Sequence, residues 1–378
     1  MVVSNQKIRS KSISTYLLKH KILTVVGARP QFIKAAPLSK ALAESENLTE
    51  VLVHTGQHYD YALSQQFFDE LGLPTPQYNL EIGSGRHAVQ MGQILIKLDA
   101  VLEAEKPDMV VVFGDTNSTA AAAIVAAKNN IPLAHVEAGL REGNKKIPEE
   151  VNKLLTDSVS DLYFAPTQTG VDNLKKQGIT QNVFLTGDIG IDLIVNGLDK
   201  IKANKSLLQK LEITEGSYFF MTCHRASNTN DVENLKQILS TFADINEPII
   251  FPIHPRTRLT IEQNGLGHFL EKKNVKVIEP IGFWDTQTLI RHAKMVLTDS
   301  GGVIKEAYFH RVPCLILDKQ IEWIEAVNEG WSHIVGANRN RILEKIHNFG
   351  DPSVQSHFLG DGTAAKKIVE HISTFLKK

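Results

Sequence analysis

The sequence predicts an α/β protein with two doubly wound domains, each a parallel sheet covered by helices on both faces. The chain of 378 residues is too long for one ordinary domain and long enough for two. Short apolar runs rich in β-branched residues alternate with helical patterns along most of the chain. The runs are continuously apolar, which is typical of parallel strands buried on both faces.

The first half of the chain contains the first series of predicted strands. Helical patterns lie between them, at about residues 30–46, 88–102, 119–128 and 149–159. The pattern at 88–102 has Val89, Ile94 and Leu98 on one apolar stripe, and the one at 119–128 is rich in alanine. The predicted strands occupy residues 22–26, 50–54, 109–113, 131–136, 162–165 and 183–185.

A second series of strands follows a mixed, lysine-rich stretch that extends from Gly187 to about Ser217. Helical patterns separate these strands as well, and a further helix is expected at residues 363–377. The predicted strands occupy residues 218–222, 249–253, 275–278, 295–298 and 314–317.

The two series predict two domains that meet near residue 190. Ligands of open parallel sheets bind at the carboxyl ends of the strands, so we expect the site in the cleft between the domains. We allow for the last helix to pack back onto the first domain. The predicted parts are an N-terminal extension at 1–20, a first domain at 21–190 and a second domain at 191–362.

Composition excludes several classes of protein. A formal net charge of −1 gives no reason to expect a nucleic-acid surface, and no apolar run is long enough to span a bilayer. Cys223 and Cys314 lie in separate apolar runs, which predicts buried thiols and a reducing, cytoplasmic setting. The first twenty residues carry four basic residues and no acidic one. They are interpreted as a disordered extension, with a transit peptide as the alternative.

The segment Thr298-Asp-Ser-Gly-Gly-Val-Ile-Lys-Glu306 is the most informative part of the chain. It joins a predicted strand to a predicted helix through the turn Ser300-Gly301-Gly302. Free N–H groups and the positive end of the helix dipole point to the same place there, so this turn predicts an anion site. Glu306 follows on the helix, where its carboxylate could accept hydrogen bonds from sugar hydroxyls. A phosphorylated sugar or a nucleotide is the expected ligand.

Basic residues follow the first strand, in Gly27-Ala-Arg-Pro-Gln-Phe-Ile-Lys34. Arg29 and Lys34 flank a helix start with Pro30 in its first turn, and two cations suit a diphosphate. The alternative is a solvated basic turn. The segment is not a G-x-G-x-x-G fingerprint, so no nicotinamide or flavin cofactor is expected.

Three carboxylates follow neighbouring strands or open a helix in the first domain. Asp115 follows the most apolar strand, Glu137 follows the next one, and Glu149 comes after Pro148 at a helix start. A carboxylate in such a place can also cap a helix or favour its dipole. Three of them at one sheet edge nevertheless indicate positioned acids and bases for proton transfer.

Histidines and arginines follow two strands of the second domain. His224 and Arg225 follow the first of them, and His254 and Arg256 follow the next. His224 is expected to face the cleft, with a hydrogen-bonded structural histidine as the alternative. His54 and His58 have a spacing that metals can use on a helix, but they follow a strand, so no metal site is expected.

Together these segments resemble the non-hydrolysing UDP-N-acetylglucosamine 2-epimerase family, in motif order and spacing from about residue 22 to 336. The matching motifs are Gly27-Ala-Arg-Pro-Gln-Phe-Ile-Lys34, His54-Thr-Gly-Gln-His58, Gly114-Asp-Thr-Asn-Ser118, His135-Val-Glu-Ala-Gly-Leu-Arg141, Pro148-Glu-Glu150, Thr222-Cys-His-Arg225 and Thr298-Asp-Ser-Gly-Gly302 through Glu306.

The resemblance implies two Rossmann-like domains in the glycosyltransferase-B arrangement, with an interdomain cleft. It implies a homodimeric enzyme that interconverts UDP-GlcNAc and UDP-ManNAc without a cofactor, in surface-polysaccharide precursor synthesis. The catalytic residues would be Asp115, Glu137, Glu149 and His224. The UDP-binding residues would be Arg29, Lys34, His224, Ser300, Gly301, Gly302 and Glu306. Further candidates are Gln57, His58, Arg141, Arg225, His254 and Arg256.

The family's chemistry accounts for this set of residues. The C2 proton has no adjacent carbonyl, so the family eliminates UDP to form 2-acetamidoglucal and then adds it back. Cations and helix-end N–H groups would stabilise the leaving diphosphate. The carboxylates would exchange a proton near neutral pH, and burial is expected to favour this by raising their pKa.

Three segments depart from the pattern of UDP-GlcNAc enzymes: Gln31-Phe32, Gly143-Asn-Lys-Lys-Ile147 and Gln320-Ile-Glu-Trp-Ile-Glu325. They are more similar to the branch that includes UDP-2,3-diacetamido-2,3-dideoxy-glucuronate 2-epimerases, which is the alternative activity. A glycosyltransferase of the same architecture and a UDP-sugar binding protein without catalysis are alternatives of other classes. Some family members bind an activating UDP-GlcNAc near the Gln-His motif, here Gln57-His58, and activation stays open.

Overall fold

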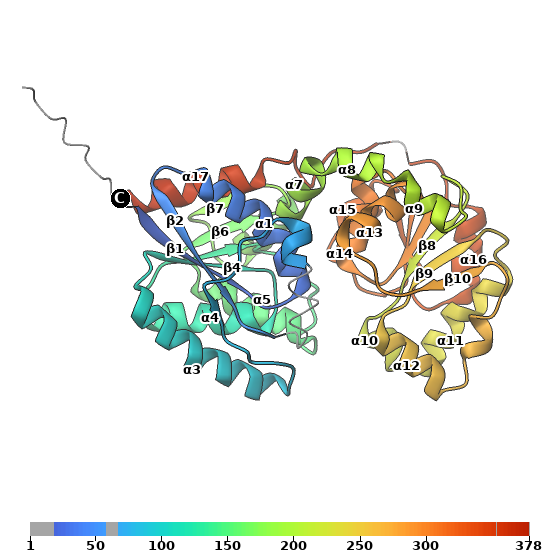
Figure 1. Cartoon of the computed structure of the whole chain (residues 1–378), viewed down its shortest axis with the longest axis horizontal. Helices are drawn as coiled ribbons and strands as arrows, with labels where there is room; N and C mark the ends of the chain where they lie inside the picture. Colours follow the sequence, from blue (N-terminus) through green and yellow to red (C-terminus); the bar gives the residue numbers. More distant parts are fainter. Residues whose placement is uncertain (1–18, 58–66, 353, 378) are drawn as a thin grey trace, which may run out of the picture.

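The computed structural model describes residues 19–57, 67–352 and 354–377. Most of the predicted N-terminal extension and His58 therefore lie outside the described residues. The rest forms two α/β lobes side by side (Figure 1). The lobe that begins the chain lies on the left of the view and the second lobe on the right.

The first lobe contains a parallel sheet with seven strands among the described residues, in the order β3-β2-β1-β4-β5-β6-β7. Its core strands are apolar on both faces: Ile22, Leu23, Val25 and Val26 of β1 are fully buried. The strands are β1 (His20–Val26), β2 (Leu48–His54), β3 (Tyr78–Asn79), β4 (Met109–Phe113), β5 (Leu133–Val136), β6 (Leu162–Ala165) and β7 (Val183–Leu185).

Helices cover both faces of this sheet. On one face α4 packs between α3 and α5, and on the other α1 contacts α7 and α17. Within α3 the predicted stripe is buried at Ile94 and Leu98, but Val89 is 54 % exposed. The helices are α1 (Arg29–Ala43), α3 (His87–Glu105), α4 (Asn117–Lys128), α5 (Pro148–Val159), α6 (Gln168–Lys176) and α7 (Ile189–Asn196).

The second lobe repeats the same strand order, β10-β9-β8-β11-β12-β13, again with parallel pairing throughout the described strands. The strands are β8 (Phe219–Thr222), β9 (Ile249–Pro252), β10 (Val275–Ile278), β11 (Met295–Thr298), β12 (Cys314–Ile316) and β13 (Ser332–Ile334). The helices are α8 (Leu198–Ala203), α9 (Lys205–Lys210), α10 (Ala226–Thr229), α11 (Val232–Ser240), α12 (Pro255–Gln263), α13 (Phe283–Arg291), α14 (Gly301–Phe309), α15 (Ile324–Asn328) and α16 (Arg339–His347), with 3-10 turns at Thr241–Ala243 and Gly267–Phe269.

The chain returns to the first lobe at its end. The last helix, α17 (Ala364–Leu376), lies beside α1 and α7, and the red ribbon in Figure 1 crosses from the second lobe to reach it. Asp192 of α7 fixes the start of α17 by accepting the backbone N–H groups of Ala364 and Ala365. The predicted domain boundary near residue 190 stays a prediction.

The two-lobe α/β architecture and the predicted strands are confirmed, and some elements were not predicted. The elements that were missed are the short strands β3 and β13 and the helices α6, α7, α8, α9, α15 and α16. β13 reads Ser-His-Ile and lies at a sheet edge, so it has no apolar run to reveal it. In the part of the chain that the structure describes, no helix is long and apolar enough to cross a membrane.

Candidate active site

The site lies where strand order reverses in each sheet. In the first lobe β1 and β4 are neighbours, and in the second lobe β8 and β11 are neighbours. A crevice opens at such a switch point because the connections after the two strands lead to opposite faces. The four connections begin at Gly27, Gly114, Cys223 and Asp299, so four of the predicted motifs occupy these positions.

The turn after β11 has the geometry of an anion site. Ser300 is the N-cap of α14 with an extended backbone (φ −88°, ψ 120°), and no described side chain caps this helix end. A Cβ atom added to Gly301 would lie 3.4 Å from Oε2 of Glu322, 3.6 Å from Nη2 of Arg225 and 3.7 Å from Nε1 of Trp323. The helix dipole and the Arg225 guanidinium both favour a negative ligand at this turn.

Asp299 joins the two connections of the second lobe. Its carboxylate is buried and accepts the backbone N–H groups of His224 and Arg225 at 3.0 and 2.9 Å. The His224 ring is 41 % exposed and lies 5.7 Å from the His254 ring. Desolvation in the cleft lowers the pKa of His224, although Asp299 opposes this. Because 41 % of its side chain is exposed, His224 is not enclosed as a structural histidine would be.

Glu137 and Lys34 meet at the carboxyl edge of the first sheet. Lys34, on α1, forms an ion pair with Oε2 of Glu137, and Lys305 of α14 lies 3.4 Å from Oε1. Glu137 has a φ of +75°, a left-handed conformation that side-chain-bearing residues rarely adopt. Strained backbone of this kind clusters at functional sites.

One expectation about the carboxylates is wrong for Glu137. Burial alone would raise the pKa of its carboxyl group, but the ammonium groups of Lys34, Lys305 and Lys153 more than offset this and hold the pKa well below its usual range. Glu137 is therefore ionised in this arrangement.

Asp115 lies beside a second buried lysine. Nζ of Lys153, on α5, is 3.4 Å from Oδ2 of Asp115 and forms an ion pair with Glu322 of the second lobe. Asp115 does not cap the following helix, because Thr116 is the N-cap and accepts the N–H of Thr119. The capping alternative is therefore wrong.

Glu149 and its neighbour differ in position. Glu149 is exposed in the first turn of α5, whereas Glu150 is 3 % exposed and accepts the backbone N–H groups of Glu142 and Gly143. The structure thus brings Asp115 and Glu137 close to buried lysines and leaves Glu149 at the rim.

Arg29 and Glu306 approach the cleft from opposite lobes. The Arg29 guanidinium lies 4.3 Å from the centre of the Phe67 ring and donates to the carbonyl oxygen of Ile281 in the second lobe. It is therefore not part of a solvated turn. Burial raises the pKa of Glu306 to about 7, although Gln287, Lys305 and Arg29 oppose the shift.

The further candidates are spread around the cleft. The side-chain oxygen of Gln57 accepts from the backbone and hydroxyl of Ser118, so it supports the connection after β4. Arg225 reaches Glu142 and Asp318, both at 3.4 Å. His254 caps α12, and Arg256 donates to Asn230. Arg141 instead pairs with the buried Asp157, away from the turn.

Sequence reasoning missed four charged residues of the site: Lys153, Asp188, Lys305 and Glu322. Lys305 lies between Gly302 and Glu306 in the segment that predicts the anion site. Lys153 follows Glu149 by one helical turn, which was the available signal. The pairing of Lys153 with Glu322 joins residues 169 positions apart, and no local pattern encodes it.

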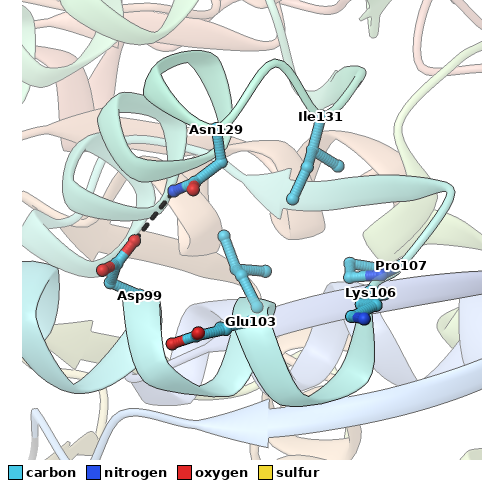
Figure 2. Close-up of a pocket in the computed structure, with 7 residues that line it drawn as sticks. Asp99, Glu103, Lys106, Pro107, Asn129 and Ile131 are labelled. Carbon is cyan, nitrogen blue, oxygen red and sulfur yellow. Dashed lines mark hydrogen bonds between the residues drawn. The ribbon is translucent and has the colours of Figure 1, made fainter.

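A surface hollow elsewhere does not belong to this site. It is lined by Asp99, Glu103, Lys106 and Asn129 among others, and the side chain of Asn129 donates to Asp99 (Figure 2). Its residues lie at the end of α3 and before β4 and β5. It therefore opens at the amino edge of the sheet, opposite the cleft.

Comparisons with known proteins agree with this arrangement. The model of the UDP-N-acetylglucosamine 2-epimerase family matches residues 40–373. A Methanococcus maripaludis protein named UDP-N-acetylglucosamine 2-epimerase homolog is 48 % identical, over 93 % of this chain and 98 % of its own. The UDP-2,3-diacetamido-2,3-dideoxy-D-glucuronate 2-epimerase of Pseudomonas aeruginosa is 41 % identical, over 93 % of this chain and 99 % of its own.

A solved structure shows the same fold. The Methanocaldococcus jannaschii UDP-GlcNAc 2-epimerase, crystallised with UDP-GlcNAc and UDP, is 38 % identical with a TM-score of 0.88, over 94 % of this chain and 99 % of that one. The family match extends over most of the chain and includes residues of both lobes. The chain therefore belongs to the UDP-N-acetylglucosamine 2-epimerase family.

Proposed function

We propose that this protein is a UDP-sugar 2-epimerase that interconverts UDP-GlcNAc and UDP-ManNAc. One observation carries the proposal: the anion-binding turn of α14 and the carboxylates Asp115 and Glu137 lie at the same cleft, joined across it by Lys153 and Lys305. A leaving diphosphate and groups that transfer a proton would thus meet at one substrate.

The second lobe would hold the UDP half of the substrate. The N–H groups at Ser300, Gly301 and Gly302 would bind phosphate, and Glu306 would accept the ribose hydroxyls. Arg29, Lys34 and His224 would surround the diphosphate. These cations would stabilise negative charge as it develops on the leaving oxygen.

The sugar reaction balances without an oxidant or a reductant. A base removes the C2 proton, the electron pair forms the C1–C2 double bond, and the C1–O bond breaks to release UDP. The products are 2-acetamidoglucal and UDP. Addition of UDP at C1 with protonation on the opposite face of C2 gives the epimer. Asp115 and Glu137 are the groups proposed for these proton transfers, with Glu149 available from the rim.

The Lys34–Glu137 pair suggests how the substrate activates its own base. The Lys34 ammonium is the largest cause that lowers the pKa of Glu137. When Lys34 turns to the diphosphate, Glu137 loses this partner and becomes more basic. The carboxylate would then be a competent base when substrate is bound.

A second candidate substrate is the UDP-2,3-diacetamido-2,3-dideoxy-glucuronate. The Pseudomonas relative favours it, as do the departures at residues 31–32, 143–147 and 320–325. Two of the departures adjoin the site: the side chain of Gln31 accepts the N–H of Gly27, and Glu322 contacts Lys153. The chemistry at C2 is the same for both sugars.

Proton NMR of the sugar signals tests the assignment. The protein is incubated with each UDP-sugar separately, with and without an acceptor alcohol. Appearance of the C2 epimer of UDP-GlcNAc supports the proposal, and epimerisation of only the uronate supports the second candidate. UDP release that depends on the acceptor would identify a glycosyltransferase, and binding without turnover of either sugar would leave only a UDP-sugar binder.

The same proposal includes a cytoplasmic homodimer that acts in surface-polysaccharide precursor synthesis. Val151, Leu155 and Val159 of α5 form an exposed stripe with a spacing of four residues and exposed fractions of 38, 41 and 36 %. Val89 and Ile96 of α3 are 54 and 76 % exposed. Both helices flank α4, so these side chains supply an apolar face for a second copy.

A further inference from the structure

Lys305 joins the two lobes across the cleft, but the proposed function gives it no part in the reaction. It is on α14, one helical turn after Gly301, and is 7 % exposed. A lysine this buried needs compensating charge, because desolvation of an ammonium group is costly.

Two carboxylates of the first part of the chain supply that charge. Nζ of Lys305 lies 2.5 Å from Oδ2 of Asp188 and 3.4 Å from Oε1 of Glu137. Asp188 is itself the N-cap of α7, where it accepts the N–H of Gly190. Lys305 therefore connects α14, the helix that follows the predicted anion site, to Asp188 and Glu137 of the first lobe.

We propose that Lys305 is a positioning residue of the epimerase reaction: it holds the Glu137 carboxylate in place from the opposite lobe, so that Glu137 is aligned only when the cleft is closed. This inference rests on the proposed function and adds to it a residue that the function did not include.

Two lysines contact Glu137, and we assign them different roles. Lys34 reaches Glu137 from α1 and is proposed to turn to the diphosphate, whereas Lys305 stays with Asp188. Lys153, on α5, is further away and is engaged by Asp115 and Glu322. Of these three lysines, Lys305 alone would therefore stay in contact with the Glu137 carboxylate throughout the reaction.

The position of Lys305 on α14 connects binding to alignment. A ligand on the turn at Gly301 fixes α14, and the ammonium group one turn later moves with it. A shift of Glu137 by about 1 Å is enough to cost about 10²-fold in rate. Binding of UDP by the second lobe would thus place the carboxylate of the first lobe.

The test uses variants of the full chain. The variant K305M/D188N removes both charges of the buried pair and keeps an oxygen to cap α7, and K305R keeps the cation. K276M is the matched control, because Lys276, on β10 at the edge of the second sheet, is a partly exposed lysine paired with Glu212. For each variant, kcat, the Kd for UDP and the carboxyl ¹³C NMR titration of Glu137 are measured.

The expected result is a loss of about 10²-fold in kcat for K305M/D188N, with the Kd for UDP within about threefold of wild type. The Glu137 midpoint should rise by about one pH unit or more, since a cation near the carboxylate is lost. K305R should leave the midpoint low, and K276M should change nothing.

Contrary results separate this inference from the proposed function. If the wild type is active and K305M/D188N has the same kcat and the same Glu137 midpoint, the role of Lys305 is overturned. The proposed function then still stands. Equal losses in kcat and UDP affinity would make Lys305 a UDP-binding residue instead. If the wild type turns over neither UDP-sugar, the proposed function fails, and the ¹³C titration still decides whether Lys305 holds Glu137.

Discussion

Nδ1 of His135 lies 2.6 Å from Oδ1 of Asp157, and neither side chain is exposed. The other ring nitrogen lies 2.8 Å from the carbonyl oxygen of Gly114. The His135 ring is thus fixed between a carboxylate and a backbone carbonyl oxygen, one at each ring nitrogen. Oδ2 of Asp157 accepts from Gly139 and Arg141. The cluster thus connects the segments that carry Asp115 and Glu137.

This cluster predicts a large loss of stability for Asp157→Ala. The substitution leaves the Arg141 guanidinium and the buried His135 ring without their shared carboxylate, which should lower the free energy of unfolding by about 3–5 kcal/mol. Urea denaturation followed by circular dichroism measures it. Glu279→Ala is the control, because Glu279 is 81 % exposed in its pair with Arg258, and no measurable change is expected. Similar small changes in both variants would refute the structural importance of the cluster.

The two carboxylates of the cleft predict a separation of turnover from binding. Asp115→Asn and Glu137→Gln should each lower kcat by about 10²–10⁴-fold, because a positioned acid or base contributes that much. The Kd for UDP should change little, since neither carboxylate is among the residues proposed to bind UDP. Isothermal titration with UDP and a coupled assay give the two quantities. Retention of full turnover by both variants would remove these residues from the chemistry.

Glu306 predicts that UDP binds more tightly as pH rises through about 7. Burial raises the pKa of this carboxyl group to about 7, so it is largely protonated below that pH and ionised above it. Both oxygens of the ionised carboxylate can accept hydrogen bonds from hydroxyl groups. In the protonated form one oxygen carries a hydrogen and acts as a donor. Calorimetric Kd values from pH 5.5 to 8.5 test this.

Glu306→Gln is the control for that titration, because the phosphate of UDP also ionises in this range. The variant should bind UDP more weakly at high pH and should keep only the pH dependence of the phosphate. Identical pH profiles for the wild type and the variant would show that Glu306 does not titrate with ligand binding.

The exposed stripe of α5 predicts that Leu155→Glu yields a monomer. A charge in an apolar interface loses its hydration without gaining a partner, which disfavours association. Sedimentation equilibrium measures the mass. Val232→Glu on α11 is the matched control, since Val232 is 38 % exposed and lies in the other lobe. A wild-type monomer, or a dimer that survives Leu155→Glu, contradicts the proposed interface.

Much of the fold could be predicted because its signals are local. The strands Met109–Phe113 and Met295–Thr298 are apolar throughout, and continuous burial on both faces leaves that mark in the sequence. β13 could not be predicted, because its pairing with β12 stabilises a segment with little strand character of its own.

The site was predictable in position and only partly in its charges. Strand ends place Asp115 and Glu137 at the carboxyl edge of the first sheet and Ser300 at the carboxyl edge of the second, since this follows from parallel topology alone. The ionisation of Glu137 could not be predicted, because it depends on Lys34 and Lys305, which approach from 103 positions before it and 168 after it. The sequence indicated that Glu137 is buried, which raises its pKa. The lysines that pair with it lower the pKa by more, so the net shift is downward.

Deuterium exchange at C2 of the sugar tests the central claim most directly. Wild-type protein and Glu137→Gln are incubated with UDP-GlcNAc in D2O, and C2 is followed by NMR. The elimination route predicts that deuterium enters C2 of both UDP-GlcNAc and UDP-ManNAc with wild type, and that the variant loses this exchange. Absence of exchange by wild type, with UDP-GlcNAc and with the diacetamido-glucuronate, would contradict the assignment of this cleft as an epimerase site.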